Sequence, residues 1–180
     1  TLESHESDTY FEQFSCRLVG DIHSEDFHKA WQQVVSSHDV LRTAFVWERV
    51  RQPIQVVHEN AEIPWTELDW RDLNGDEQDV AFQQLLADDL AKGFELDQAP
   101  LMRVMMIRLS DDCRRMVWSH HHLLLDGWSV SQLLKEVSLQ YEATRNGQPV
   151  PIDTPPRFRD YVGWLLEQDT KEAESFWRKA

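Results

Sequence analysis

Three consecutive histidines and an aspartate stand close together in the middle of the chain. Residues 119–129 read SHHHLLLDGWS, so Asp126 follows His122 by four positions. A histidine titrates near neutral pH and can therefore take or give a proton during a reaction. The Asp126 carboxylate can accept hydrogen bonds from the start of a helix or pair with an arginine, and Gly127 permits an unusual backbone conformation or a close approach that a Cβ would block. The segment is therefore a candidate site for acid–base or hydrogen-bonding chemistry.

A metal site is the main alternative for a histidine cluster. Successive side chains of a strand point to opposite faces, so three consecutive histidines do not converge on one ion. The chain has two cysteines, Cys16 and Cys113, and they fit no metal-ligand spacing. We therefore predict no metal, interpret the cysteines as buried free thiols, and interpret His121 and His120 as structural side chains at the end of a strand.

Alternating strands and helices must position this segment. Hydrophobic patterns predict strands over residues 10–18, 41–47, 53–58, 63–70 and 101–109, and one more that ends near Ser119. They predict helices that begin at Ser24 as N-cap, at Gly75 and after Gly127, and two short helical runs over 158–167 and 171–180 that follow a proline-rich connector. This alternation favours a two-layer α/β sandwich, an α+β arrangement. The candidate site lies where a buried strand passes into a loop, a common place for reactive groups.

Composition excludes several other classes of protein. The chain has 180 residues, 41% of them hydrophobic, which suits one globular domain or a large subdomain. Its net charge of −14 argues against a nucleic-acid partner, because no basic stripe is available to displace counterions. No apolar run is long enough to span a membrane, and no signal peptide opens the chain. We expect a cytoplasmic protein, and we interpret both ends as cuts in a longer chain.

The histidine segment has a close parallel in a known family. Residues 121–127 match the HHxxxDG signature of condensation domains from nonribosomal peptide synthetases. Three more segments, in the family's order, resemble its RHExLRTxF, FDLxxxPLxR and FxDYxxW motifs: residues 37–45, 94–103 and 158–164. Ser37 and Asp39 depart from the second motif, where the family has arginine and glutamate. The chain is thus identified as similar to a condensation domain, on a standard that places each motif in its structural context.

The resemblance implies a fold and a place within it. Condensation domains look like chloramphenicol acetyltransferase, with two similar subdomains in a V and a tunnel between them. By this resemblance residues 1–180 form the N-terminal subdomain, and 149–180 supply the proline-rich connector and helices that lead to the C-terminal subdomain. The tunnel would be walled on one side by this chain.

It also implies a reaction: amide-bond formation between aminoacyl or peptidyl thioesters. These are carried on the 4′-phosphopantetheine arms of donor and acceptor peptidyl carrier proteins, beside adenylation domains of the same polypeptide, and the domain itself would bind no cofactor. His122 matches the histidine that acts on the reaction, as a general base or as a hydrogen-bonding, positioning group. Asp126 is expected to be structural, with Arg42 as its ion-pair partner, although Asp126 can also serve as a helix cap alone.

Three further residues of the segment follow Asp126. Gly127 is expected to keep the tunnel open beside His122. Trp128 and Ser129 are expected to line it, although a core position suits a tryptophan about equally well.

Other functions share the signature. Epimerisation, terminal cyclisation and several acyltransferase domains carry related HHxxxDG motifs, whereas the paired aspartates of heterocyclisation domains are not found here. A separate alternative is that the chain is an inactive subdomain or a carrier-binding fragment. In that case it should turn over little alone and associate through its former interface.

Overall fold

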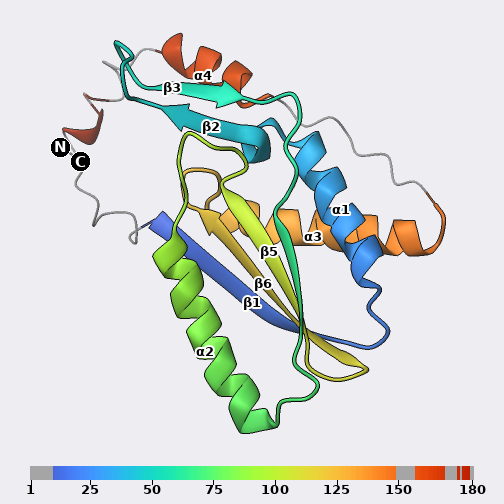
Figure 1. Ribbon diagram of the computed structural model, residues 1–180. Helices are drawn as coiled ribbons and strands as arrows, with labels where there is room; N and C mark the ends of the chain where they lie inside the picture. The colour runs from blue at the N-terminus through green and yellow to red at the C-terminus, as the bar shows by residue number, and fades with distance from the viewer. Residues whose placement is uncertain (1–9, 149–156, 169–173, 175, 179–180) are drawn as a thin grey trace.

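The computed structural model describes residues 10–148, 157–168, 174 and 176–178. Its elements, in chain order, are β1 (Phe11–Val19), α1 (Ser24–Ser37), the 3-10 helix η2 (Asp39–Arg42), β2 (Thr43–Val46), β3 (Ile54–Val57), β4 (Trp65–Asp69), α2 (Gly75–Lys92), β5 (Met102–Arg108), β6 (Cys113–His121), α3 (Gly127–Arg145) and α4 (Phe158–Leu166). Four strands form a mixed sheet in the order β1-β6-β5-β4, and β2 and β3 form a separate hairpin (Figure 1).

Strand β6 lies inside the main sheet. It pairs antiparallel with β1 on one side and with β5 on the other. Strand β4 runs parallel to β5, as a strand–helix–strand crossover through α2 requires. Because β6 has a neighbour on both edges, its last residues, His120 and His121, are presented from the interior of the sheet.

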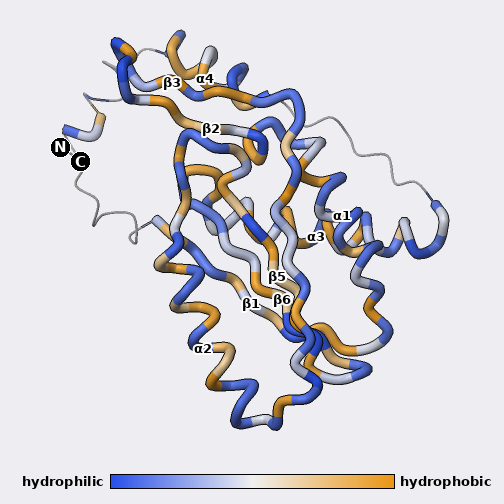
Figure 2. Tube along the Cα trace, in the orientation of Figure 1, coloured by the Kyte–Doolittle hydropathy of each residue, from blue (hydrophilic) through white to orange (hydrophobic). Residues whose placement is uncertain are grey.

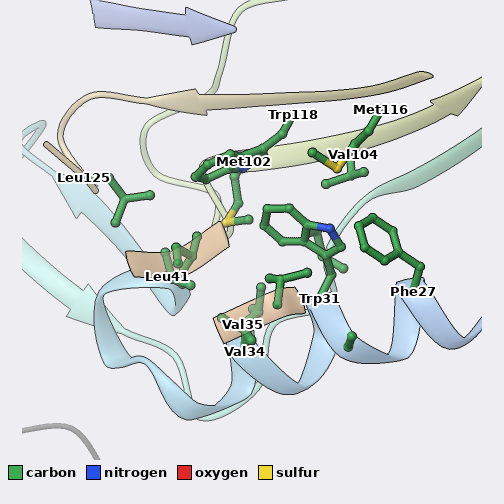
Figure 3. Close-up of a cluster of buried hydrophobic side chains, with 14 of the residues drawn as sticks. Phe27, Trp31, Val34, Val35, Leu41, Met102, Val104, Met116, Trp118 and Leu125 are labelled. Atoms are coloured by element: carbon green, nitrogen blue, oxygen red, sulfur yellow. The ribbon is translucent and has the colours of Figure 1, made fainter. Parts of the chain in front are cut away.

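The larger part of the core lies between the sheet and the helices α1 and α3. Helix α1 directs Phe27, Trp31 and Val34 toward the sheet at helical spacing (Figure 3). The rings of Trp31 and Trp118 lie 5.0 Å apart, and both side chains are fully buried. Each large apolar side chain buried in this way contributes about 1.5–3 kcal/mol. This packing fixes α1 and α3 on one face of the sheet.

Helix α2 covers the opposite face. Phe82 of α2 packs with Met105, Ile107 and Val117 of the sheet in a second, smaller cluster. In Figure 2 α2 is hydrophobic at intervals along its length and hydrophilic between them. The predicted strand over 101–109 is confirmed as β5, which is buried on both faces. The predicted α/β class is also confirmed, and helices on both faces of the sheet add a layer to the expected two-layer arrangement.

Several boundaries differ from the sequence-based expectation, and those of β2 and α1 have a clear cause. The predicted strand over 41–47 begins later, because η2 comes first and the Thr43 hydroxyl bonds to the Asp39 carbonyl oxygen at 2.9 Å. Helix α1 begins at Ser24, but its N-cap residue is His23, and the Ser24 hydroxyl bonds to the Glu67 carboxylate instead. Cys16 and Cys113, expected to be buried, are free and only half-buried. The proline-rich connector and most of the predicted run over 171–180 lie outside the described residues.

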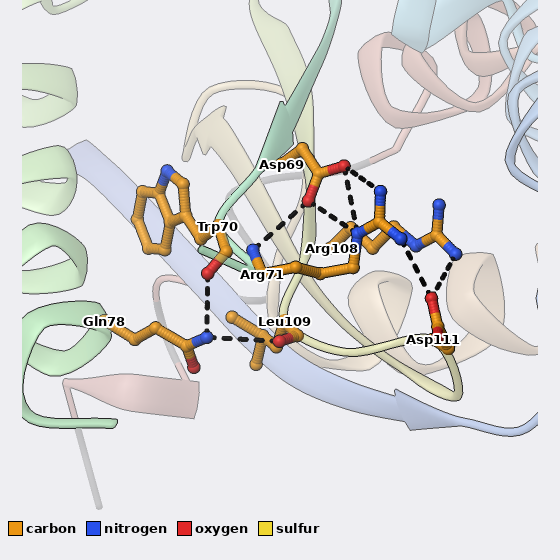
Figure 4. Close-up of polar contacts among 7 residues, drawn as sticks. All are labelled: Asp69, Trp70, Arg71, Gln78, Arg108, Leu109 and Asp111. Atoms are coloured by element: carbon orange, nitrogen blue, oxygen red, sulfur yellow. Dashed lines mark hydrogen bonds and ion pairs between the residues drawn. The ribbon is translucent and has the colours of Figure 1, made fainter. Parts of the chain in front are cut away.

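Polar contacts hold the end of the sheet that lies farthest from the histidines (Figure 4). The Gln78 amide of α2 donates to the carbonyl oxygens of Trp70 and Leu109, at 3.0 and 3.1 Å, so the helix is tied to the ends of β4 and β5. Nearby, Arg71 donates three side-chain hydrogen bonds to Asp69. These bonds lower the pKa of Asp69 to about 2.

No helix in the part of the chain described is long and apolar enough to cross a membrane.

Helix α2 begins at Gly75, as the sequence indicated, and Asn74, the residue before it, is the N-cap of a capping box. The Asn74 side chain accepts a hydrogen bond from the Glu77 amide at 3.1 Å, and the Glu77 carboxylate accepts one from the Asn74 amide at 2.9 Å. We expect Asn74→Ala to lower the free energy of unfolding by about 1 kcal/mol, because alanine leaves the helix amide without its partner. Urea unfolding measures this, with Asp72→Ala as an exposed control nearby. An equal loss in both variants would contradict the cap.

Candidate functional site

The three histidines at the end of β6 occupy three different environments. The side chain of His120 is buried and stacks on Trp118, with ring centroids 4.5 Å apart. Burial, with the neighbouring histidines as a smaller cause, lowers the pKa of His120 to about 4, so this ring is neutral at neutral pH. His120 therefore belongs to the packed face of the sheet.

His121 points to the other face by strand alternation and is also buried. Its Nδ1 accepts a hydrogen bond from the Leu123 amide at 3.1 Å, so the proton of the neutral ring is on Nε2. Burial lowers the pKa of His121 as well. The Leu124 amide bonds to the His121 carbonyl oxygen at 3.0 Å, and the Leu124 and Leu125 side chains are buried. His121 thus shapes the turn that follows the strand.

His122 is the one histidine of the three that faces solvent. Its backbone amide bonds to the Tyr10 carbonyl oxygen at 2.7 Å, so the residue before β1 holds its main chain. His122 lines a cleft of about 880 Å³. The other walls come from the end of α1, η2, the β2–β3 hairpin, the 123–126 loop and the start of α4. Figure 1 shows the hairpin and α4 beside this end of the sheet.

Asp126 is the N-cap of α3. One of its carboxylate oxygens accepts hydrogen bonds from the Ser129 amide at 2.8 Å and from the Ser129 hydroxyl at 2.7 Å. These bonds lower the pKa of Asp126. Arg42 instead pairs with Asp39 at 2.7 Å and donates to the carbonyl oxygens of His58 and Glu59. The predicted Arg42–Asp126 pair is therefore wrong: the helix start uses the carboxylate, and a nearer acid takes the arginine.

The residues after Asp126 also differ in position from one another. A Cβ on Gly127 would meet no atom of the described chain within 4 Å, and its φ is not positive, so neither close approach nor backbone strain requires glycine there. Trp128 is 83% exposed, so the core position is not found for it, and it is not among the residues that line the cleft. Ser129 lines the cleft, and its place in the tunnel stays a prediction.

Sequence reasoning missed several residues of the cleft. His38 was not among the predicted site residues, yet it lines the cleft, and its Nε2 lies 2.6 Å from Glu136 Oε2 of α3. Its place inside the 37–45 motif was the available signal. Gln55 and Tyr161 also line the cleft, and the pattern gave no signal for Gln55. Among the described residues no cluster of three or more His, Cys, Asp or Glu side chains is arranged to hold a metal ion.

Comparison with known proteins identifies the family. The profile described as "Condensation domain" matches residues 2–180. This chain belongs to the condensation-domain family. Relatives include a linear gramicidin synthase protein from Brevibacillus parabrevis, 40% identical over 97% of this chain, and bacitracin synthase 3 from Bacillus licheniformis, 37% identical over 98% of it. The chain spans only 2% and 3% of the lengths of these two proteins.

Solved condensation domains share the fold. The starter condensation domain of the rhizomide synthetase RzmA aligns over 96% of this chain and 42% of its own, with a TM-score of 0.80 and 20% identity. SgcC5 from Streptomyces globisporus aligns over 94% of this chain and 39% of its own, with a TM-score of 0.75 and 25% identity. The fold predicted from the HHxxxDG resemblance is thus confirmed.

The buried ring of His120 should make this condensation domain sensitive to mild acid. Its folded pKa of about 4 lies below the usual 6.5, so the unfolded chain binds more protons between these values. The contribution of the neutral His120 ring to the free energy of unfolding is therefore complete above pH 6.5 and is lost as the pH falls toward 4. We expect His120→Phe to remove about 1.3 kcal/mol of the stability difference between pH 7.5 and pH 5.5. Urea unfolding at both pH values measures it, and an unchanged difference would contradict the buried neutral ring.

Because Arg42 and Asp126 contact different partners, we expect mutations of the two residues to affect the free energy of unfolding independently. In a double-mutant cycle, we expect the effects of Arg42→Ala and Asp126→Ala on unfolding free energy to add within about 0.5 kcal/mol. The matched cycle of Arg42→Ala with Asp39→Ala should show a coupling above about 0.5 kcal/mol, because these side chains are in contact. A large coupling in the first cycle would restore the Arg42–Asp126 pair.

Proposed function

We propose that this domain forms amide bonds between thioesters held by two carrier proteins, with His122 as the acting residue. The proposal rests mainly on one observation: of the three histidines, His122 alone is exposed, and it alone is among the residues that line the cleft. Relatives named as gramicidin and bacitracin synthases support a role in peptide synthesis. The neutral, buried His120 and His121 support the cleft wall and do not enter it.

In the proposed reaction the acceptor's α-amine attacks the carbonyl carbon of the donor thioester. A C–N bond forms, the C–S bond breaks, the departing thiolate takes up the proton that the nitrogen loses, and the longer peptide stays on the acceptor arm. A neutral amine needs no base before it attacks, so orientation supplies a large share of the rate. We therefore assign His122 chiefly to hydrogen bonding of the attacking amine and of the tetrahedral state that follows.

The partners follow from the same proposal. Donor and acceptor peptidyl carrier proteins would present their 4′-phosphopantetheine arms to the cleft, beside adenylation domains of the same synthetase. The chain spans 42% of the rhizomide condensation chain, so we expect residues outside the matched part to complete the wall that faces His122. For this reason we expect the isolated 180-residue chain to be nearly inactive.

The reaction can be followed on the acceptor carrier by intact mass spectrometry. The protein that carries this domain is mixed with donor and acceptor carriers loaded with simple aminoacyl groups. We expect the dipeptidyl mass to appear, and His122→Ala to slow its formation roughly 100-fold or more. His122→Gln should keep more activity than His122→Ala, since an amide can still hydrogen-bond to the amine.

His58→Ala is the matched control, because His58 is another exposed histidine and does not line the cleft. It should leave the rate unchanged. If no dipeptide forms but the carrier-bound residue changes its stereochemistry, the domain is an epimerase. If neither product forms and the carriers still bind, it is a carrier-binding module.

A further inference from the structure

One carboxylate of α2 contacts three neighbouring strands at a single level of the sheet. Gln13 of β1, Ser119 of β6 and Arg103 of β5 lie directly opposite one another. Asp89 Oδ2 accepts hydrogen bonds from the Gln13 amide at 2.7 Å and from the Ser119 hydroxyl at 2.5 Å. Its Oδ1 accepts one from Arg103 Nε at 2.5 Å. We call these four residues the Asp89 clamp.

The charges of the clamp are buried and hydrogen-bonded. The side chains of Arg103 and Asp89 are 10% and 4% exposed. Beyond its bond to the carboxylate, Arg103 donates to the carbonyl oxygens of Asp89 at 2.6 Å and Gly93 at 2.7 Å. Its guanidinium also lies over the rings of Phe94 and Phe11. A buried pair with this many partners holds a defined geometry, because any shift leaves a charge without hydrogen bonds.

Gln13, Ser119 and Arg103 lie just before the turn of residues 121–124, which we call the histidine turn. Beyond these residues, the His121 amide bonds to the Leu101 carbonyl oxygen of the β5 side at 2.9 Å. The His122 amide bonds to the Tyr10 carbonyl oxygen of the β1 side at 2.7 Å. The main chain of the turn is therefore suspended between β1 and β5, and these are the two strands that the clamp fixes to β6. If one strand slides, His122 moves with its hydrogen-bond partner.

We propose that Asp89, acting with Ser119 and Arg103, is a positioning residue for His122. The carboxylate locks the mutual register of β1, β6 and β5 where the sheet ends, and this sets where the imidazole stands in the cleft. The inference rests on the proposed function for its catalytic consequence, but its structural part does not depend on any activity.

Ser119→Ala tests the clamp with a small change, since it removes one hydroxyl and keeps both charges. Val117→Ala is the matched control: Val117 is buried on the same face of β6, two residues earlier, and belongs to the apolar cluster around Phe82. Hydrogen exchange in the full-length protein reports on the amides of residues 121–123. We expect roughly 5- to 10-fold faster exchange there in Ser119→Ala, the factor set by one ordinary hydrogen bond. In Val117→Ala, the exchange rates of these amides should not change relative to those of the other amides of β6.

Kinetics supply the second measurement. In dipeptide formation, Ser119→Ala should lower kcat roughly 10-fold and change KM less than roughly twofold, because a displaced group weakens the transition state more than binding. The kcat of Ser119→Cys, which keeps a weak hydrogen-bond donor, should lie between that of the wild type and that of Ser119→Ala. Unchanged exchange in Ser119→Ala, or an equal effect of Val117→Ala on exchange and kcat, would overturn the proposal. If the wild-type protein makes no dipeptide, the proposed function fails, and exchange alone still decides whether the clamp positions His122.

Discussion

The pairing of β6 with strands on both of its edges is the constraint on which the site depends. An inner strand that is also covered on both faces must bury every side chain along its length, and β6 does so from Met116 to His121. Apolar groups and neutral rings meet this demand, which explains why His120 and His121 are packed and uncharged at neutral pH. His122 comes directly after β6 and is not covered by the helices on either face of the sheet. Its exposure is thus a consequence of where the strand ends.

Much of this arrangement was visible in the sequence. Period and capping patterns indicated the main helices, and the apolar run over 101–109 indicated a strand. The 119–129 segment indicated a strand, a loop and a helix in that order, and the structure has them. These features are local, or they follow from burial alone, so a pattern of residue types is enough to predict them.

Contacts between distant residues were less predictable, because a pattern states which groups seek partners but not which partners are nearest. Arg42 and Asp126 were both available for an ion pair, yet Asp39, three residues before Arg42, was closer. The cleft has the same difficulty, since the end of α1, the β2–β3 hairpin and α4 meet only in three dimensions. Asp89 did leave a signal: it continues the sheet-facing stripe of Phe82 and the partly buried Leu86, where a charged residue needs a partner.

The neutrality of the packed histidines also shapes the electric field of the cleft. Two imidazoles beside His122 add no positive potential at neutral pH, so an approaching ammonium group would not be repelled by the strand end. The field is left to the arginines and acids around the opening, such as Arg157 and Asp160, on a protein whose net charge is −14. Ionic strength should therefore alter how charged ligands reach the cleft more than it alters the histidine turn itself.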